Sequence, residues 1–307
     1  MNHKNKLLAG LTSSFIMITI SICLFLHPAN LYSQSDTLNK LTSELIETKI
    51  ISNRVIIVKL GANAITAIST QKGIVVVDAG MSNSLSEIFR RIIEKEYNRT
   101  DFACLINTHS HPDHTGGNQV FSGTKIIGHE NCLKGIAENW KDPERTKSRL
   151  GQIIAQLDQN LQNSESGSND WKNYLSQKIL YQNTLKDFMT DRVVTLPTVT
   201  FTDTLNLNFG DATCGLVYFG KAHSESDILI HIPEEKILMT GDLFSAWGKP
   251  HFDNKTGLDK ARWMIVRQWV SARLDKIDTV ITGHGQILPK SDLELFLKNI
   301  ENIKNEN

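Results

Sequence analysis

The chain has 307 residues, which is enough for one large domain or two small ones. Lys and Arg together number 33, and so do Asp and Glu, so the formal net charge is zero. This balance excludes the basic field of a nucleic-acid-binding protein and the acidic tail of a disordered one, and we expect no nucleic-acid partner.

The N-terminus has the pattern of an export signal. Lys4 and Lys6 precede an apolar stretch at residues 7–26 that is interrupted only by small and hydroxyl residues. Cleavage after Ala29 or Ser33 would leave a periplasmic or secreted protein. The stretch is also close to the roughly 20 residues that span a bilayer. An uncleaved N-terminal membrane anchor is therefore the alternative.

The cysteines argue against a disulfide framework. Cys23 lies in the export segment, which leaves Cys104, Cys132 and Cys214 for the mature protein. An odd number allows at most one disulfide. Cys104 and Cys214 lie in apolar, strand-like runs, so we expect buried thiols there.

We expect residues 1–33 to be the signal or anchor and residues 34–307 to be a single domain. Short apolar or alternating runs predict strands in its first half, at residues 54–60, 64–69, 73–78, 102–106 and 125–128. Ser84, with Glu87 three residues later, is the expected N-cap of a helix that runs to Tyr97.

The segment from about residue 130 to residue 191 differs from the rest. Its apolar residues are sparse and helically spaced, with a polar loop at residues 164–168, so we predict two or more inserted helices. Its aromatic side chains either line an apolar cleft or pack between helices; they are Trp140, Trp171, Tyr174 and Tyr181.

Strands resume in the second half. They are predicted at residues 200–202, 205–207, 213–219, 227–232, 237–240 and 277–282, with helices at 259–274 and from an N-cap at Ser291. Because the strands that precede helices are short apolar runs, both sheets are expected to be covered by helices, which gives a layered α/β domain.

The run from Asn107 to Gly117 contains a cluster of side chains that can bind a metal. It places three histidines and one aspartate within six residues, His109-Ser110-His111-Pro112-Asp113-His114. Imidazole and carboxylate are ligands of a borderline cation such as Zn²⁺. Pro112 rules out an ordinary helix through the run, and the glycines at 116–117 mark a turn. The run therefore predicts a metal-binding loop at the carboxyl end of a buried strand.

The second half supplies further candidates. His109 and His111 are two residues apart and project to the same side of an extended segment, whereas Asp113 and His114 lie beyond the proline. A catalytic zinc needs about three protein ligands and one open position. Three further candidates each follow a strand-like run and have glycine nearby: His223, Asp242 and His284.

These motifs together resemble the metallo-β-lactamase fold superfamily. They are His-x-His-x-Asp-His at 109–114, Gly-x-x-His at 220–223, Gly-Asp at 241–242 and Gly-His-Gly at 283–285, and Asp78 matches the first motif of the family. The resemblance covers roughly residues 50–300. It implies a four-layer αββα sandwich of two packed mixed β-sheets flanked by helices, with the helical insertion at about 130–191 between its halves.

The resemblance also implies the roles of the site residues. His109, His111 and His223 would bind one Zn²⁺, Asp113, His114 and His284 a second, and Asp242 would bridge them. Asp78 would accept a hydrogen bond that orients a ligand, or only cap the turn after its strand. Two zinc ions per chain would share a hydroxide that attacks an ester, lactone, thioester or amide of a small-molecule substrate. Asp113 is expected to orient the nucleophile and to relay its proton.

Two alternatives remain open. Class B β-lactamases of the best-known type carry cysteine where this chain has Asp242, whereas thioesterases like glyoxalase II and lactonases carry aspartate. Persulfide dioxygenases keep the histidine motif but bind one iron, and they do not require His114 or His284 as ligands, so a metal count separates them. In the loop at residues 244–254, side chains of Trp247, Lys249 and His251 are candidates for contact with substrate.

Overall fold

The computed structural model describes residues 40–190, 192–244 and 260–301. The described residues from Leu41 onward form one compact unit. The predicted signal or anchor at residues 1–33 and the domain start at residue 34 lie outside the described residues and stay predictions. Among the residues described, no helix combines the length and the apolar character needed to cross a membrane.

Within this described part, the first sheet has seven strands in the order of the sequence. They are β1 (Ile46–Ile50), β2 (Val55–Leu60), β3 (Asn63–Thr70), β4 (Gly73–Val77), β5 (Phe102–Ile106), β6 (Lys125–His129) and β7 (Val199–Phe201). Strands β1 to β4 pair antiparallel, and β4 to β7 pair parallel.

The second sheet has six strands in the described ranges, in the order β13-β12-β11-β10-β9-β8. They are β8 (Thr204–Asn208), β9 (Thr213–Tyr218), β10 (Ile228–Ile232), β11 (Ile237–Gly241), β12 (Thr279–Thr282) and β13 (Ile287–Pro289). Only β11 and β12 pair parallel, so this sheet is also mixed.

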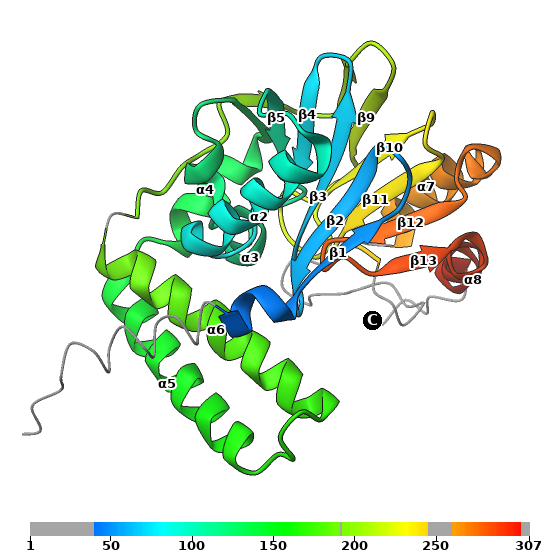
Figure 1. Cartoon of the computed structure of the whole chain (residues 1–307). Helices are drawn as coiled ribbons and strands as arrows, with labels where there is room; N and C mark the ends of the chain where they lie inside the picture. The colour runs from blue at the N-terminus through cyan, green and yellow to red at the C-terminus, as the bar shows by residue number, and fades with distance from the viewer. Residues whose placement is uncertain (1–39, 191, 245–259, 302–307) are drawn as a thin grey trace, which may run out of the picture. The chain divides into compact units, whose positions relative to one another are not determined.

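Helices flank the two sheets, and a pair of long helices projects away from them (Figure 1). The helices are α2 (Asn83–Tyr97), α3 (Pro112–Thr115), α4 (Asn131–Asn139), α5 (Pro143–Gln162), α6 (Asn169–Met189), α7 (Lys260–Ser271) and α8 (Lys290–Glu301), with 3₁₀ turns η1 (Asn118–Phe121) and η2 (Leu274–Lys276). The inserted helices α4, α5 and α6 lie between β6 and β7 in the chain.

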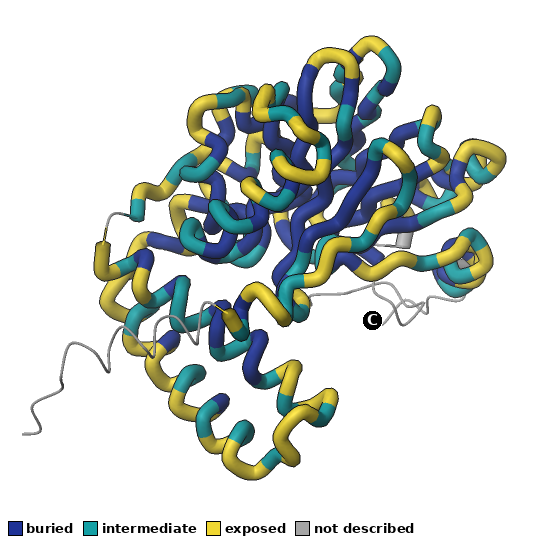
Figure 2. The backbone as a smooth tube through the Cα atoms, viewed as in Figure 1, coloured by how far each residue is buried: buried dark blue, intermediate teal, exposed yellow. Residues whose placement is uncertain are grey.

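The layers follow from strand alternation, because neighbouring side chains of a strand point to opposite faces. Val55 and Ile57 of β2 pack between the two sheets, whereas Ile56 and Val58 pack outward among residues of α2 and α6. On the far face of the second sheet, α7 and α8 pack against β10, β11 and β12. Figure 2 shows the strands buried along most of their length. The predicted four-layer αββα sandwich is confirmed.

Several local predictions differ from the structure. Strands β1 and β13 were not predicted, since one alternates poorly and the other has three residues. The N-cap of α2 is Ser82, which has an extended backbone and whose Oγ accepts the Leu85 N–H at 3.3 Å. Ser84 lies inside the helix, and its hydroxyl donates to Asp187. Helix α8 begins at Lys290, so Ser291 lies inside it.

The three cysteines beyond the N-terminal segment, Cys104, Cys132 and Cys214, are buried and form no disulfide. Burial raises the pKa of the Cys104 and Cys132 thiols to about 12, so both stay protonated at neutral pH. This agrees with the expectation of buried thiols that pack as small apolar side chains.

Candidate metal centre

The site forms where strand ends of both sheets meet. The segment after β5 carries His109 and His111, and α3 begins at Pro112, where a proline fits the first helical position. The segment that follows β9 carries His223. The backbone N–H of Ile228 donates to the Thr108 carbonyl at 3.0 Å, which ties the two sheets together beside the site.

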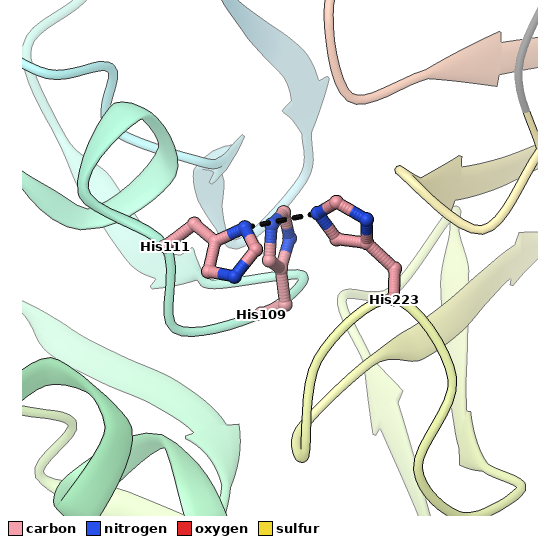
Figure 3. Close-up of side chains that lie close together, drawn as sticks. All are labelled: His109, His111 and His223. Carbon is pink, nitrogen blue, oxygen red and sulfur yellow. Dashed lines mark hydrogen bonds between the residues drawn. The ribbon is translucent and has the colours of Figure 1, made fainter. Parts of the chain in front are cut away.

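Three histidines form the first group of candidate ligands. One nitrogen from each of His109, His111 and His223 lies within 4.8 Å of the others. Figure 3 shows the three imidazoles pointing toward one another, with the dashed line joining His223 Nε2 to His111 Nδ1 at 2.9 Å. The donor set is the one predicted for the first metal, and it is suited to zinc.

The second group consists of Asp113, His114 and His284, whose donor atoms also lie within 4.8 Å of one another. His114 Nε2 is 3.5 Å from Asp113 Oδ2, and His284 Nε2 is 3.9 Å from the same oxygen. The side chain of Asp113 is 37% exposed, while His114 is buried. The predicted second set of ligands is therefore also brought together.

Asp242 lies between the two groups. Its Oδ2 atom is 3.5 Å from His223 Nε2 and 4.0 Å from His109 Nε2 in the first group. The same oxygen is 3.5 Å from His114 Nε2 and 3.3 Å from His284 Nε2 in the second. A single carboxylate oxygen thus faces both groups, which is the position expected of a bridging ligand.

The outer ring nitrogens fix the orientation of the histidines. His114 Nδ1 is 2.8 Å from Asp78 Oδ2, His284 Nδ1 is 2.8 Å from the Ala62 carbonyl oxygen, and His109 Nδ1 is 3.1 Å from Thr108 Oγ1. A ring that donates Nδ1–H outward directs the lone pair of Nε2 inward, which is the arrangement that metal sites require.

The inner atoms of the centre suit a cation. Within the described part of the chain, His109 Nε2 and His114 Nε2 are buried and have no hydrogen-bond partner. Buried polar atoms of a native protein normally have partners, so atoms aimed at a common centre point to an ion. The donor set of five imidazoles and two carboxylates fits the two predicted metals.

Asp78 holds two of the histidines through one carboxylate. Its Oδ1 accepts the backbone N–H of Thr108 at 2.8 Å, and its Oδ2 accepts the Thr108 hydroxyl at 2.8 Å. Because that hydroxyl also contacts His109 Nδ1, Asp78 reaches His109 through Thr108 and reaches His114 directly. Of the two roles expected for Asp78, the contacts match the one that orients ligands.

Burial and neighbouring charges shift the pKa values of the site residues. Burial, with His114 nearby, holds the pKa of His109 well below its ordinary value, so its ring is neutral and able to bind a metal. Burial would also lower the pKa of His114, but the carboxylates of Asp113, Asp78 and Asp242 raise it well above its ordinary value. Burial would raise the pKa of Asp242, yet His114 and His284 hold it far below its usual range.

Gly283 leaves no room for a side chain beside the centre. A Cβ atom at this position would lie 2.3 Å from Asp242 Oδ1 and 2.8 Å from His114 Cε1. We expect Gly283→Ala to displace both groups and to lower hydrolytic turnover by about 10²-fold, since a displacement of about 1 Å can have that effect. The measurement is turnover together with metal content.

Gly151→Ala is the matched control, because a Cβ there meets nothing within 4 Å and the residue lies within α5. This variant should keep full turnover and gain up to about 1 kcal/mol of stability. Equal turnover of Gly283→Ala and Gly151→Ala would contradict the tight fit around Asp242.

A cavity of about 650 Å³ opens onto the second group, with His111, Asp113 and His284 in its lining. A second cavity of about 510 Å³ is also lined by His111 and reaches His223. The asparagine Asn139 lines both, and its Nδ2 donates to the Ser110 carbonyl at 2.8 Å.

The aromatic residues of the insertion divide between the two roles considered for them. Tyr181 lines the larger cavity, and Trp171 packs against the core. Trp140 does both, since it lines the cavity and packs with Cys132 and Ile136. The loop candidates Trp247, Lys249 and His251 lie outside the described residues.

Some contributors were not predicted. Thr108, Asn139 and the Ala62 carbonyl act through hydrogen bonds that depend on tertiary contacts, and no motif marks them. Arg149 lines the cavity from α5. Its helical spacing with Thr146 and Ile153 is the one available signal, and it is interpretable only once the helices are placed.

Comparisons with known proteins agree with this site. The family model of the metallo-beta-lactamase superfamily matches residues 58–284. The chain is 25% identical over 239 residues to metallo-beta-lactamases type 2 from Bacillus sp. (strain 170) and from Bacillus cereus, an alignment that covers 77% of this chain and 71% of each relative.

Solved structures share the fold at lower identity. A metallo-beta-lactamase from Pontibacter korlensis superposes with a TM-score of 0.55 at 19% identity, over 84% of this chain and 100% of that one. A stereoselective inverting sec-alkylsulfatase from Pseudomonas sp. gives a TM-score of 0.61 at 15% identity, over 87% of this chain and 43% of that one. With the family model spanning every candidate ligand from His109 to His284, the chain belongs to the metallo-β-lactamase superfamily.

Proposed function

We propose that this chain is an exported, zinc-dependent hydrolase that holds two metal ions and cleaves an ester, lactone, thioester or amide bond of a small molecule. The observation that carries the proposal is the position of Asp242 Oδ2, within 4.0 Å of imidazole nitrogens from both ligand groups. The apolar stretch at residues 7–26, with lysines before it, supports export.

In this proposal His109, His111 and His223 hold one metal, and Asp113, His114 and His284 hold the other, with Asp242 between them. When bound, a pair of zinc ions supplies a hydroxide nucleophile near neutral pH and polarises the scissile carbonyl. Asp113 is the one of the two ligand carboxylates that lines the larger cavity, so it is placed to accept a proton from the nucleophile and return it to the leaving group.

A class B-like β-lactamase is the second candidate. It is favoured by the relatives at 25% identity, which are metallo-beta-lactamases type 2. Asp242, which stands where the best-known enzymes of that class carry cysteine, argues for a different substrate. A chromogenic cephalosporin is therefore the first substrate to assay, beside a lactone and a thioester.

A single-iron dioxygenase would need neither His114 nor His284. We expect the purified protein to contain two zinc ions per chain, to lose hydrolysis in a chelator and to regain it with Zn²⁺. His114→Ala should remove most of the hydrolysis and one of the two ions while the protein stays folded, as measured by metal analysis and circular dichroism.

His231→Asn is the control, since His231 lies on β10 and its Nε2 is 3.2 Å from the Lys276 carbonyl oxygen, away from the ligands. It should keep two ions per chain. One iron per chain, or wild-type turnover in His114→Ala, would contradict the binuclear hydrolase.

A further inference from the structure

The inserted helices form one wall of the larger cavity, whose lining also includes the candidate ligands His111, Asp113 and His284. Helix α5 contributes Thr146, Arg149, Leu150 and Ile153 to the lining. These positions follow the i, i+3, i+4, i+7 spacing of a single helix face, so Arg149 is on the face directed at the cavity.

Helix α6 completes this wall with uncharged side chains. Gln177, Leu180 and Tyr181 lie along one of its faces, and α5 and α6 run side by side as a helical hairpin (Figure 1). Among the described residues of the lining, Arg149 is the one lysine or arginine and Asp113 the one carboxylate. Asp113 is a candidate metal ligand, so none of the described lining residues supplies a carboxylate dedicated to the guanidinium.

Arg149 differs in this respect from two lysines on the same helices. Lys147 Nζ is 2.9 Å from Glu144 Oε1, and Lys178 forms an ion pair with Asp158. Among the described residues, Arg149 forms no ion pair and no side-chain hydrogen bond. Positions 145 and 153, one turn away on either side, hold arginine and isoleucine, which cannot pair with it.

Tyr181 adds a second donor beside Arg149. Its hydroxyl has no hydrogen-bond partner within the described part of the chain, and burial raises the pKa of its phenol, so the group keeps its proton. A guanidinium and a phenol together present several N–H and O–H donors to one region of the cavity. Such a set of donors is suited to an anion.

The rest of this wall is apolar. Trp140 and Leu150 are buried, as is Leu180, and all three line the cavity. A ligand that fills the space would place an apolar body against them, with a charged end near Arg149.

We propose that Arg149 and Tyr181 bind the carboxylate of an organic anion whose apolar body lies against Trp140, Leu150 and Leu180, while its scissile bond reaches the ligands at the cavity floor. This assignment rests on the proposed hydrolase function, and it specifies the substrate class as anionic and amphiphilic.

The test compares two ligands that differ only in charge. Binding of 4-phenylbutyrate and of its uncharged amide to the zinc-loaded protein is measured by titration calorimetry. We expect the carboxylate to bind more tightly and Arg149→Gln to lower its affinity about tenfold, with little change for the amide. Arg149→Lys should retain part of the affinity, and Tyr181→Phe should lower it less than Arg149→Gln.

Arg145→Gln is the matched control, because it removes the same charge from the same helix but from a residue outside the lining. If the carboxylate is held only by the metals, or only attracted by the overall charge of the protein, its affinity for Arg149→Gln and for Arg145→Gln will be equal. That result overturns the assignment.

The kinetics of hydrolysis distinguish failure of the carboxylate assignment from failure of the proposed hydrolase function. Hydrolysis is followed for the mono-4-nitrophenyl ester of suberic acid and for 4-nitrophenyl octanoate, which share the scissile bond. We expect Arg149→Gln to raise KM for the anionic ester alone. Hydrolysis of both esters with no dependence on Arg149 overturns the carboxylate site, whereas no hydrolysis by the zinc-loaded wild type overturns the hydrolase.

Discussion

Replacement of Asp242 by asparagine is expected to lower hydrolytic turnover by at least about 10²-fold, because an interaction worth several kcal/mol is lost and each 1.4 kcal/mol is tenfold in rate. The Oδ2 atom faces His223 and His109 on one side and His114 and His284 on the other. An amide keeps the shape but removes the negative charge that the two ions share.

Metal content is the decisive measurement for this variant. We expect Asp242→Asn to hold fewer than two zinc ions per chain after dialysis. Asp242→Cys is the informative comparison, since a thiolate restores both the charge and a good zinc ligand. It should regain much of the metal content, whereas two firmly bound ions in Asp242→Asn would show that the carboxylate is not shared.

The ligands could be predicted because their signals are local. Each follows an apolar strand and stands beside glycine or proline, and the identity of the side chain restricts its chemistry. The layers could be predicted for the same reason, since residues such as Val55 and Ile56 alternate between two buried faces. Short apolar strands and metal-binding motifs can be recognised from a few consecutive residues.

The features that escaped prediction depend on distant partners. Ser84 has the local pattern of an N-cap, but the helix begins at Asn83 with Ser82 as its cap. The hydroxyls of both serines donate to Asp187, more than one hundred positions away. The Ala62 carbonyl that orients His284 is a backbone group with no side-chain signature. Arg149 lines the cavity only because α5 docks beside α6, and helix docking is set by tertiary packing rather than by spacing alone.

Asp78 allows a direct test of a role that depends on tertiary contacts. It is not one of the seven candidate ligands, yet it contacts His114 directly and reaches His109 through Thr108. It is buried, and it accepts hydrogen bonds from the Thr108 N–H, the Thr108 hydroxyl and His114 Nδ1–H. An asparagine has one oxygen and would turn an amide donor toward His114 or Thr108. A donor facing His114 Nδ1 favours the tautomer with hydrogen on Nε2, which is unable to bind a metal.

We therefore expect Asp78→Asn to lower zinc affinity by about 10- to 100-fold, the range seen when groups that orient ligands are replaced. Unfolding of the metal-free variant, where zinc cannot contribute to stability, should show a loss of about 1–3 kcal/mol. Both the zinc affinity and the free energy of unfolding are needed. A variant that is merely less stable would also appear to bind zinc more weakly if zinc binding were judged from activity alone.

Asp187→Asn provides the comparison. Asp187 is also a buried carboxylate that accepts serine hydroxyls, from Ser82 and Ser84, but it has no contact with a candidate ligand. It should lose a similar amount of stability while zinc affinity stays at the wild-type level. If the two variants weaken zinc binding equally, Asp78 supports only the turn after β4, and the orientation of His109 and His114 must come from packing around the rings.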